Sequence, residues 1–231
     1  LLGWLDKHGV RLLLGRAARA IRLRDGRVQG VELRDGGAVG GDGYVAAVPF
    51  DRLLDLLPPD ADEFPAFAAL RHLETSPITS VHLWYDRQVT NLPHVVLVEC
   101  VGQWLFNRGE SAPGEHYVQV VVSAARAFRG LGHDEVRRRI ADELARLFPA
   151  AAGAAALRAR VVTEHAATFS AVPGVDRWRP AQTSPIDNLF LAGDWTATGW
   201  PATMEGAVRS GYLAAEALLC LLYTSPSPRD R

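Results

Sequence analysis

The sequence predicts a mixed α/β (α+β) fold in which a strand–turn–helix unit and an antiparallel sheet form separate parts. Three observations lead to this prediction. Short apolar runs bounded by turn-forming residues alternate with segments of helical periodicity. Strand patterns separated by short turns gather between residues 81 and 122. Near the end of the chain, an apolar run at 189–192 leads through Gly193-Asp194 to a helical pattern that starts at Met204.

Composition excludes several classes of protein. The 231 residues, of which 48% are hydrophobic and 22% charged, suffice for one or two domains with a buried core. A net charge of −1 offers no footprint for a nucleic acid. Cys100 and Cys220 are isolated and the seven histidines form no HExxH pattern, so we expect a reducing cytoplasm and no metal site. The longest apolar stretch, 213–223, is interrupted by Glu216 and is too short to span a membrane.

Local patterns in the first third of the chain predict one helix end and four strands. The helix occupies residues 3–9, and the strands occupy 10–14, 20–24, 28–33 and 44–48. Asp25-Gly26 is a hairpin signal between the second and third strands, and Pro49 ends the fourth, which is apolar enough to be buried. The segment 41–46 fits the pattern G-x-G-x-x-A, but a strand follows where a dinucleotide-binding loop needs a helix. We therefore interpret it as a turn.

The middle of the chain predicts an antiparallel sheet and one long helix. The strands occupy 81–85, 95–99, 103–106 and 117–122. Apolar residues at helical spacing from Val136 to Phe148 predict a helix that Pro149 ends. Trp84, Trp104 and Phe106 fall on the strands, where they either line an apolar tunnel for a substrate or pack in the core.

The segment from Gly193 to the last helix has the features of a ligand-binding turn. Gly193 lets the backbone approach a bulky ligand, and Asp194 is an acceptor that repels phosphate but suits a sugar or ribityl hydroxyl. Thr203 is placed to cap the helix, whose first N–H groups then point outward and favour an anion. We therefore expect a nucleotide-like ligand. Trp195 and Trp200 flank the turn as ring walls or core residues, and Trp200 is the better candidate for a wall.

The helix that follows the turn shows apolar and small residues at helical spacing, which predicts the face that packs on the core. These residues are Met204, Ala207, Val208, Gly211, Ala215, Leu218 and Leu219.

These motifs resemble the C-terminal flavin-binding signature of the FAD-dependent amine oxidase and phytoene desaturase superfamily. The matching residues are Gly193-Asp194, Met204-Glu205-Gly206-Ala207 and Ser210-Gly211. Within the superfamily, the chain is similar to the branch of squalene-associated FAD-dependent desaturases, the hydroxysqualene dehydroxylases. That similarity covers roughly residues 1 to 219, and its most distinctive segments are 76–86, 102–106, 167–174, Arg179-Pro180 and 193–203.

The resemblance implies a partial FAD-binding Rossmann-like domain of the amine oxidase type with an inserted antiparallel-sheet substrate domain. Residues 1–57 and 166–219 would belong to the FAD domain, and residues 58–165 to the substrate domain, whose sheet roofs the flavin in the family. We expect residues 220–231 to be a disordered tail that is not native to the family. The dinucleotide fingerprint is absent from these residues, so the resemblance places it upstream of Leu1, in a longer protein of which this chain is a C-terminal fragment.

The resemblance also implies site residues for FAD. In the family, the residues before Met204 lie beside the ring, so we expect the Met204 N–H to meet the flavin C2 oxygen. We expect Asp194 to hold hydroxyls of the ribityl chain or those next to the pyrophosphate. The full set that the resemblance assigns to FAD is Gly193, Asp194, Trp200, Pro201, Thr203, Met204, Ala207 and, near the adenine, Ala18. No general acid or other catalytic residue can be named from the sequence.

The function that the resemblance implies is reduction of hydroxysqualene to squalene, in bacterial hopanoid biosynthesis, by an FAD-dependent oxidoreductase. Three alternatives stay open. A phytoene desaturase uses the same flavin site oxidatively, an amine oxidase usually has an aromatic residue where Thr203 stands, and the isolated chain is expected to be inactive and free of cofactor. The expected partner is a long-chain isoprenoid, whose insolubility implies peripheral contact between a cytoplasmic protein and the inner membrane.

Overall fold

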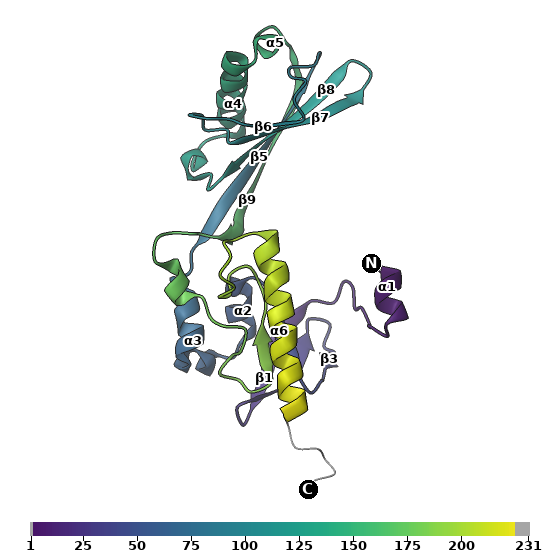
Figure 1. The fold of residues 1–231 in the computed structure, drawn as a ribbon, viewed down its shortest axis with the longest axis vertical. Helices are drawn as coiled ribbons and strands as arrows, with labels where there is room; N and C mark the ends of the chain where they lie inside the picture. Colours follow the sequence, from purple (N-terminus) through teal and green to yellow (C-terminus); the bar gives the residue numbers. More distant parts are fainter. Residues whose placement is uncertain (1, 225–231) are drawn as a thin grey trace. The chain divides into compact units, whose positions relative to one another are not determined.

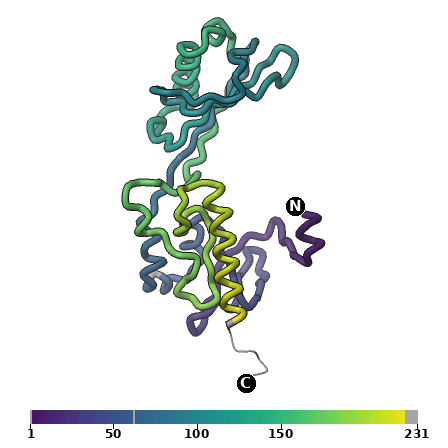
Figure 2. Tube along the Cα trace, viewed as in Figure 1, coloured from purple at the N-terminus to yellow at the C-terminus, as the bar shows by residue number. Residues whose placement is uncertain are grey.

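The computed structural model describes residues 2–224 and divides the chain into two compact units (Figures 1 and 2). One unit combines the residues up to Leu73 with those from Ala171 onward, and the other is Glu74–Ser170. Both boundaries lie later than the predicted 58 and 165. Residues 59–72 stay with the first unit because they form short helices there, and His72 stacks on Trp178 at 4.1 Å between ring centroids.

The first unit contains two small sheets. Strands β1 (Ala18–Arg24), β2 (Arg27–Leu33) and β3 (Ala38–Val39) form an antiparallel sheet in that order. Asp25 and Gly26 have φ of 52° and 72°, which is the left-handed geometry that a tight hairpin requires, so the predicted hairpin is confirmed. The interpretation of 41–46 as a turn rather than a dinucleotide-binding loop is also confirmed, since the bend at 42–43 leads directly into strand β4 (Tyr44–Ala46) and not into a helix.

The second sheet of this unit positions the candidate site. Strand β4 pairs in parallel with β10 (Leu189–Leu191), which is buried along its length. Helix α6 (Met204–Thr224) packs on both strands (Figure 1). Ala214 belongs to one buried cluster with Phe190 and Ala192. The helix therefore extends beyond the predicted end of the family-like region at 219, because Cys220 to Thr224 continue its turns. The rest of the predicted tail, residues 225–231, lies outside the described residues.

Several predictions for the first unit were wrong. Residues 10–14 form no strand, and Leu12 and Leu14 are 48% and 73% exposed, because no described strand pairs with them after α1 (Leu2–Lys7). Strand β4 is half-exposed rather than buried. The chain after Pro49 forms a helix that the sequence reading missed, α2 (Phe50–Leu56), followed by shorter helical segments. These are η1 (Pro59–Glu63), α3 (Pro65–Ala68) and η2 (Ala69–His72).

The second unit is an antiparallel sheet with one long helix, as predicted, but the sheet has five strands where four were predicted. Its strands are β5 (Thr75–Tyr85), β6 (His94–Val96), β7 (Trp104–Ala112), β8 (Glu115–Ser123) and β9 (Ala156–Phe169), in the order β6-β7-β8-β5-β9. Its helices are η3 (Arg126–Phe128), α4 (His133–Leu147) and α5 (Pro149–Ala152). Strand β9 was not predicted.

One face of this sheet is buried and the other is open. Alternate residues of β5, among them Val81 and Leu83, are fully buried under α4, which contributes Ile140 and Leu144 to the same core. The residues between them, such as His82 and Trp84, are only half-buried. The second unit therefore has a packed helical side and an open sheet face.

Buried Asn188 joins the two sheets of the first unit. Its side chain is buried, with the amide donating to the carbonyl oxygen of Val28 at 3.0 Å and the oxygen accepting from the Val28 N–H at 2.8 Å. We expect Asn188→Ala to lower the free energy of unfolding by about 2–4 kcal/mol, because both backbone groups of Val28 lose their partner. Urea denaturation measures this loss. The control is Asp187→Ala, which removes only a 3.4 Å ion pair between exposed side chains and should cost less than about 0.5 kcal/mol; equal losses would contradict the prediction.

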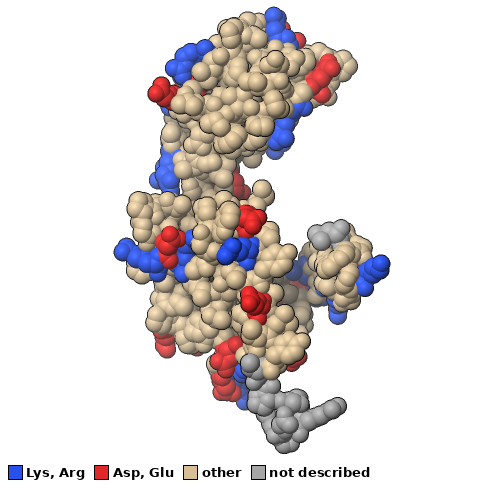
Figure 3. All heavy atoms as spheres, in the orientation of Figure 1, with Lys and Arg blue, Asp and Glu red and all other residues tan. Residues whose placement is uncertain are grey.

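The described residues were predicted to hold neither a membrane span nor a metal ion. Across 2–224, no helix is long and apolar enough to cross a membrane. The same residues contain no group of three or more His, Cys, Asp and Glu side chains able to hold a metal ion. Charged residues of both signs are interspersed on the face drawn in Figure 3, so that view shows no single-sign patch.

Candidate functional site

The candidate site is the loop between β10 and α6. Its first residue, Gly193, donates its backbone N–H to Ser210 Oγ at 2.7 Å, and this hydroxyl donates to the Ala207 carbonyl at 2.6 Å. Ser210 is fully buried on the side of α6 that faces the strand. The end of β10 is thereby fixed to the second turn of the helix, so the intervening loop has both ends anchored.

Gly193 is required by its surroundings. Its φ is +150°, and a Cβ built there would lie 2.7 Å from Trp195 Cδ1. Trp195 cannot move aside easily, because it is 2% exposed and donates Nε1–H to the Val48 carbonyl at 2.9 Å. Trp195 is therefore a core residue and does not wall a ligand. Trp200, the better candidate from the sequence, is 42% exposed.

The start of α6 has the predicted cap and an open end. Thr203 Oγ1 accepts from the Gly206 N–H at 3.1 Å, which confirms Thr203 as the N-cap. Within the part of the chain that the structure describes, no acceptor meets the N–H of Met204 or Glu205. The Met204 side chain is 89% exposed and leaves this end uncovered. Two outward N–H groups at the positive end of a helix suit the oxygen-bearing pyrimidine edge of a flavin, so the residues present fit that group.

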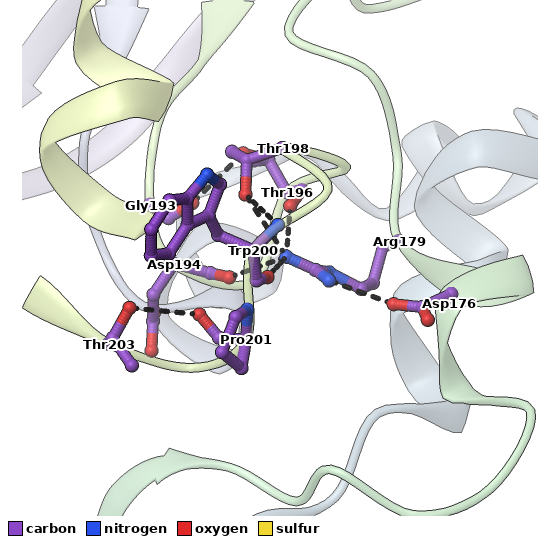
Figure 4. Close-up of polar contacts among 9 residues, drawn as sticks. All are labelled: Asp176, Arg179, Gly193, Asp194, Thr196, Thr198, Trp200, Pro201 and Thr203. Atoms are coloured by element: carbon purple, nitrogen blue, oxygen red, sulfur yellow. Dashed lines mark hydrogen bonds and ion pairs between the residues drawn. The ribbon is translucent and has the colours of Figure 1, made fainter. Parts of the chain in front are cut away.

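A buried arginine organises the loop between these two points (Figure 4). The Arg179 side chain is only 4% exposed and follows the segment η4 (Val175–Trp178). Its Nη2 donates to the carbonyl oxygens of Asp194 at 3.0 Å, Thr196 at 2.6 Å and Trp200 at 2.8 Å. Its Nη1 donates to the Asp176 carboxylate at 2.8 Å. One guanidinium therefore gathers three carbonyls of the loop.

A second set of polar contacts closes the loop from the other side. Gln182 Nε2 donates to Thr196 Oγ1 at 2.9 Å, and Thr196 Oγ1 donates to the Gly193 carbonyl at the same distance. Thr196 is fully buried and Gln182 is nearly so. The loop is therefore a preformed structure held by buried hydrogen bonds.

The predicted cofactor residues fall into two groups. Seven lie together in the loop and the first turn of α6: Gly193, Asp194, Trp200, Pro201, Thr203, Met204 and Ala207. Of these, Gly193 and Asp194 are half-buried and the rest are exposed. Ala18 stands apart at the start of β1, in the other sheet of the unit. Arg179 lies in a segment that resembles the family, but no role for it is predicted from the sequence.

The face of α6 that packs on the core differs from the predicted one. The buried positions are Gly206, Ser210 and Ala214, whereas Met204, Val208 and Leu219 are each more than half exposed. The helix is apolar or small on most of its circumference, so periodicity does not select one face. At Gly206 a small residue is required by the loop, since a Cβ there would lie 2.7 Å from the Pro201 carbonyl oxygen.

The predicted substrate residues lie on the open face of the second unit. The Trp84 and Tyr117 rings stack at 4.7 Å between centroids, and Trp104 and Phe106 stack at 5.9 Å. Trp104 is 41% exposed, so these side chains are surface aromatics rather than core residues. The aromatic row on this face is defined as Trp84, Trp104, Phe106 and Tyr117.

A histidine lies beside the aromatic row and is hydrogen-bonded to one of its members. His82 Nδ1 and the Tyr117 hydroxyl are 2.6 Å apart. Burial, followed by the positive charges of Arg160 and Arg108, lowers the pKa of His82 below its ordinary value, so the imidazole is neutral at pH 7. A neutral imidazole hydrogen-bonded to a phenol can both donate and accept a hydrogen bond.

Comparison with protein families gives one match that spans most of the chain. The model of the family described as flavin containing amine oxidoreductase matches residues 4–219. The matched residues include the loop between β10 and α6 and the whole of the second unit.

The curated relatives of this chain include phytoene desaturases from a plant and a bacterium. The 15-cis-phytoene desaturase of Solanum lycopersicum is 32% identical over 228 residues, which cover 93% of this chain and 39% of the relative. The 15-cis-phytoene desaturase of Synechococcus elongatus is 32% identical over 203 residues, covering 84% of this chain and 43% of the relative. This chain thus spans about two fifths of the length of the curated relatives that it matches.

A solved structure agrees with the fold. An oxidoreductase from Methanosarcina mazei superposes with a TM-score of 0.69 at 14% identity, over 93% of this chain and 52% of that one. At this identity the likeness concerns the fold alone. It supports the predicted fold class, a partial domain of the FAD-dependent amine oxidase type with an inserted sheet.

Proposed function

Because the chain belongs to the flavin containing amine oxidoreductase family, whose cofactor here is FAD, we propose that it is part of an oxidoreductase that desaturates a long isoprenoid hydrocarbon. The observation that supports FAD binding is the start of α6, which is capped by Thr203 but open to a ligand and which follows the loop after Gly193. The 15-cis-phytoene desaturases at 32% identity support the carotenoid-type substrate. Activity and substrate remain proposals, since the chain spans only part of such proteins.

The residues of the loop would hold FAD, which supplies hydride transfer when bound. The N–H groups of Met204 and Glu205 would donate to the pyrimidine edge of the ring, aided by the positive end of α6. Asp194 would accept hydrogen bonds from ribityl hydroxyls. Trp200 and Pro201 precede the helix start on the exposed side and would border the ring. Ala18 stays a proposal for the adenine end.

The open face of the second unit would bind the substrate. A polyene or isoprenoid chain has no charge and is recognised by apolar and aromatic surface. The aromatic row provides such a surface on a rigid antiparallel sheet, with Trp104 41% exposed and available for contact. Contact with a water-insoluble substrate also supports peripheral attachment to a membrane as part of this proposal.

A second candidate is reduction of hydroxysqualene to squalene. The resemblance of segments 76–86 and 193–203 to the hydroxysqualene dehydroxylases supports it. The feature that favours it is the pair of His82 and Tyr117, 2.6 Å apart beside Trp84. A hydroxylated substrate would form hydrogen bonds with this pair, whereas a hydrocarbon has no donor or acceptor with which to do so. The two candidates share the flavin site and differ in the direction of electron flow.

Product analysis separates the two candidates. The purified protein is incubated with 15-cis-phytoene and an electron acceptor, or anaerobically with hydroxysqualene and a reductant, and lipids are extracted for chromatography. New conjugated double bonds from phytoene support the desaturase, and squalene from hydroxysqualene supports the reductase. A visible spectrum is recorded first, because absence of flavin bands after reconstitution with FAD would support the third possibility, an inactive chain without cofactor.

Trp84 is the aromatic residue whose loss should affect substrate most. It stacks on Tyr117, and the Arg158 guanidinium lies 4.0 Å from its ring centroid. We expect Trp84→Ala to raise KM about tenfold, because stacking contacts of this kind are worth about 0.5–1.5 kcal/mol beyond the apolar area lost. Steady-state kinetics with the same substrate measure the KM of the variant and of the unsubstituted protein. Val98→Ala, at a 74% exposed apolar residue after β6, is the control, and an unchanged KM in Trp84→Ala would contradict the substrate role.

A further inference from the structure

Arg179 carries a buried positive charge that the proposed function does not yet use. Its side chain is 4% exposed, while its carboxylate partner Asp176 is 83% exposed. Placing a charge in the protein interior is costly unless hydrogen bonds and opposite charge compensate it. The Asp176 carboxylate and three loop carbonyls supply this compensation, so the charge is held stably beside the loop.

The contacts of Arg179 are directed at the loop backbone. Nη2 lies within 3.0 Å of three carbonyl oxygens, those of Asp194, Thr196 and Trp200, and 3.4 Å from Thr198 Oγ1. These residues are separated along the chain, so their carbonyls converge only because the loop curves around the guanidinium (Figure 4). A planar guanidinium can serve several acceptors from fixed directions, which an ammonium does less well.

The loop that Arg179 holds ends at the start of α6. Trp200, whose carbonyl accepts from Nη2 at 2.8 Å, is followed by Pro201, and Thr203 then caps the helix. The conformation of the last loop residues decides where the open N–H groups of Met204 and Glu205 point. The guanidinium also places a positive charge on the Trp200 carbonyl, four residues before the positive end of α6.

We propose that Arg179 is the positioning residue of the flavin site, which folds the loop before α6 around a buried positive charge and so favours the reduced, anionic form of the flavin. This inference rests on the proposed function, because it requires a flavin at the start of α6. It goes beyond that function by assigning the electrostatic control of the cofactor to a residue that does not border the ring.

The test compares three variants by two measurements. Arg179→Met removes both the positive charge and the planar guanidinium donors. Arg179→Lys keeps the charge but replaces the guanidinium with a single ammonium group. The control, Arg177→Met, removes the same charge from an exposed neighbour whose guanidinium lies over Trp178. The first measurement is amide hydrogen exchange of residues 193–207 in the protein without flavin. The second is the reduction potential and FAD dissociation constant of the flavin-loaded protein.

The expected results separate positioning from charge. Both Arg179 variants should exchange the loop amides at least tenfold faster, while Arg177→Met stays like the unsubstituted protein. Arg179→Met should also bind reduced flavin at least tenfold less well relative to oxidised flavin, which lowers a two-electron potential by about 30 mV. Arg179→Lys should recover most of that potential because it keeps the charge. If Arg179→Met does not fold, the comparison of Arg179→Lys with Arg177→Met for loop exchange and FAD affinity decides the positioning role.

Two failures can be told apart. If the unsubstituted protein binds no FAD after reconstitution, flavin binding by this chain is wrong, and the electrostatic part of the inference falls with it, whereas loop exchange in the protein without flavin still decides the positioning part. If it binds FAD but Arg179→Met leaves potential and loop exchange unchanged, or lowers stability uniformly with no change in potential, Arg179 is a structural residue only and the inference is overturned.

Discussion

Replacing Gly193 with alanine is expected to destabilise the first unit by about 2–5 kcal/mol and to abolish retention of FAD. The new Cβ would lie 2.7 Å from Trp195 Cδ1 at a backbone φ of +150°. Overpacking of a filled core costs about 1–3 kcal/mol, and strained backbone a similar amount. Trp195 is held by its hydrogen bond to the Val48 carbonyl, so the loop must move instead. Thermal unfolding and the flavin absorbance of the purified variant measure the two effects.

Gly199→Ala is the matched control for this prediction. Gly199 lies in the same loop with a φ of +73°, but nothing lies within 4 Å of a Cβ placed there. The substitution should therefore cost only the left-handed backbone strain, about 1–2 kcal/mol, and leave FAD bound. Equal losses in the two variants would show that backbone strain alone matters, and the close packing of Gly193 against Trp195 would not be the reason for the glycine.

Replacing Gly206 with alanine is expected to weaken FAD binding at least tenfold. The Gly206 Cβ would lie 2.7 Å from the Pro201 carbonyl oxygen and 3.4 Å from Thr203 Oγ1. Backbone must therefore shift at the helix start, which turns the open N–H groups of Met204 and Glu205 away from their ligand. The gain of about 1 kcal/mol in helix propensity does not offset overpacking of about 1–3 kcal/mol. Titration with FAD, followed by the change in flavin fluorescence, measures the affinity.

Gly211→Ala in the same helix should have the opposite effect on stability. A Cβ at Gly211 meets nothing within 4 Å. Alanine there should raise the free energy of unfolding by about 0.5–1 kcal/mol through helix propensity alone. If Gly206→Ala were also stabilising and bound FAD normally, the helix start would not be closely packed on the loop, and its place in the candidate site would be lost.

Local signals in the sequence predicted the parts of the fold that local chemistry decides. The Asp25-Gly26 hairpin requires left-handed backbone that these residues adopt readily, and both are found there. The apolar run of β10 and the Thr203 cap were likewise predictable, because each depends on residues within a few positions. The sequence also predicted the turn at Gly193, and its role as the centre of a flavin site stays a prediction.

Features set by distant contacts were missed. Strand β9 has exposed Arg158 and Arg160 on its open face, and its pairing with β5 follows from a partner far away in sequence. The buried face of α6 was misassigned because the helix is apolar or small on most sides. Arg179 acts on backbone carbonyls up to 21 positions away, and backbone carbonyls leave no signature in a sequence. Its motif with Pro180 was the one available signal.

The most direct test of the candidate site is to locate the flavin on the protein by the N–H groups that it contacts. Amide hydrogen exchange, or ¹⁵N–¹H chemical shifts, would be compared with and without FAD. We expect the largest protection or shift at Met204 and Glu205, with smaller changes at Gly193 and Asp194. FAD that binds tightly but leaves the amides of residues 193–207 unchanged would show that the start of α6 is not the flavin site.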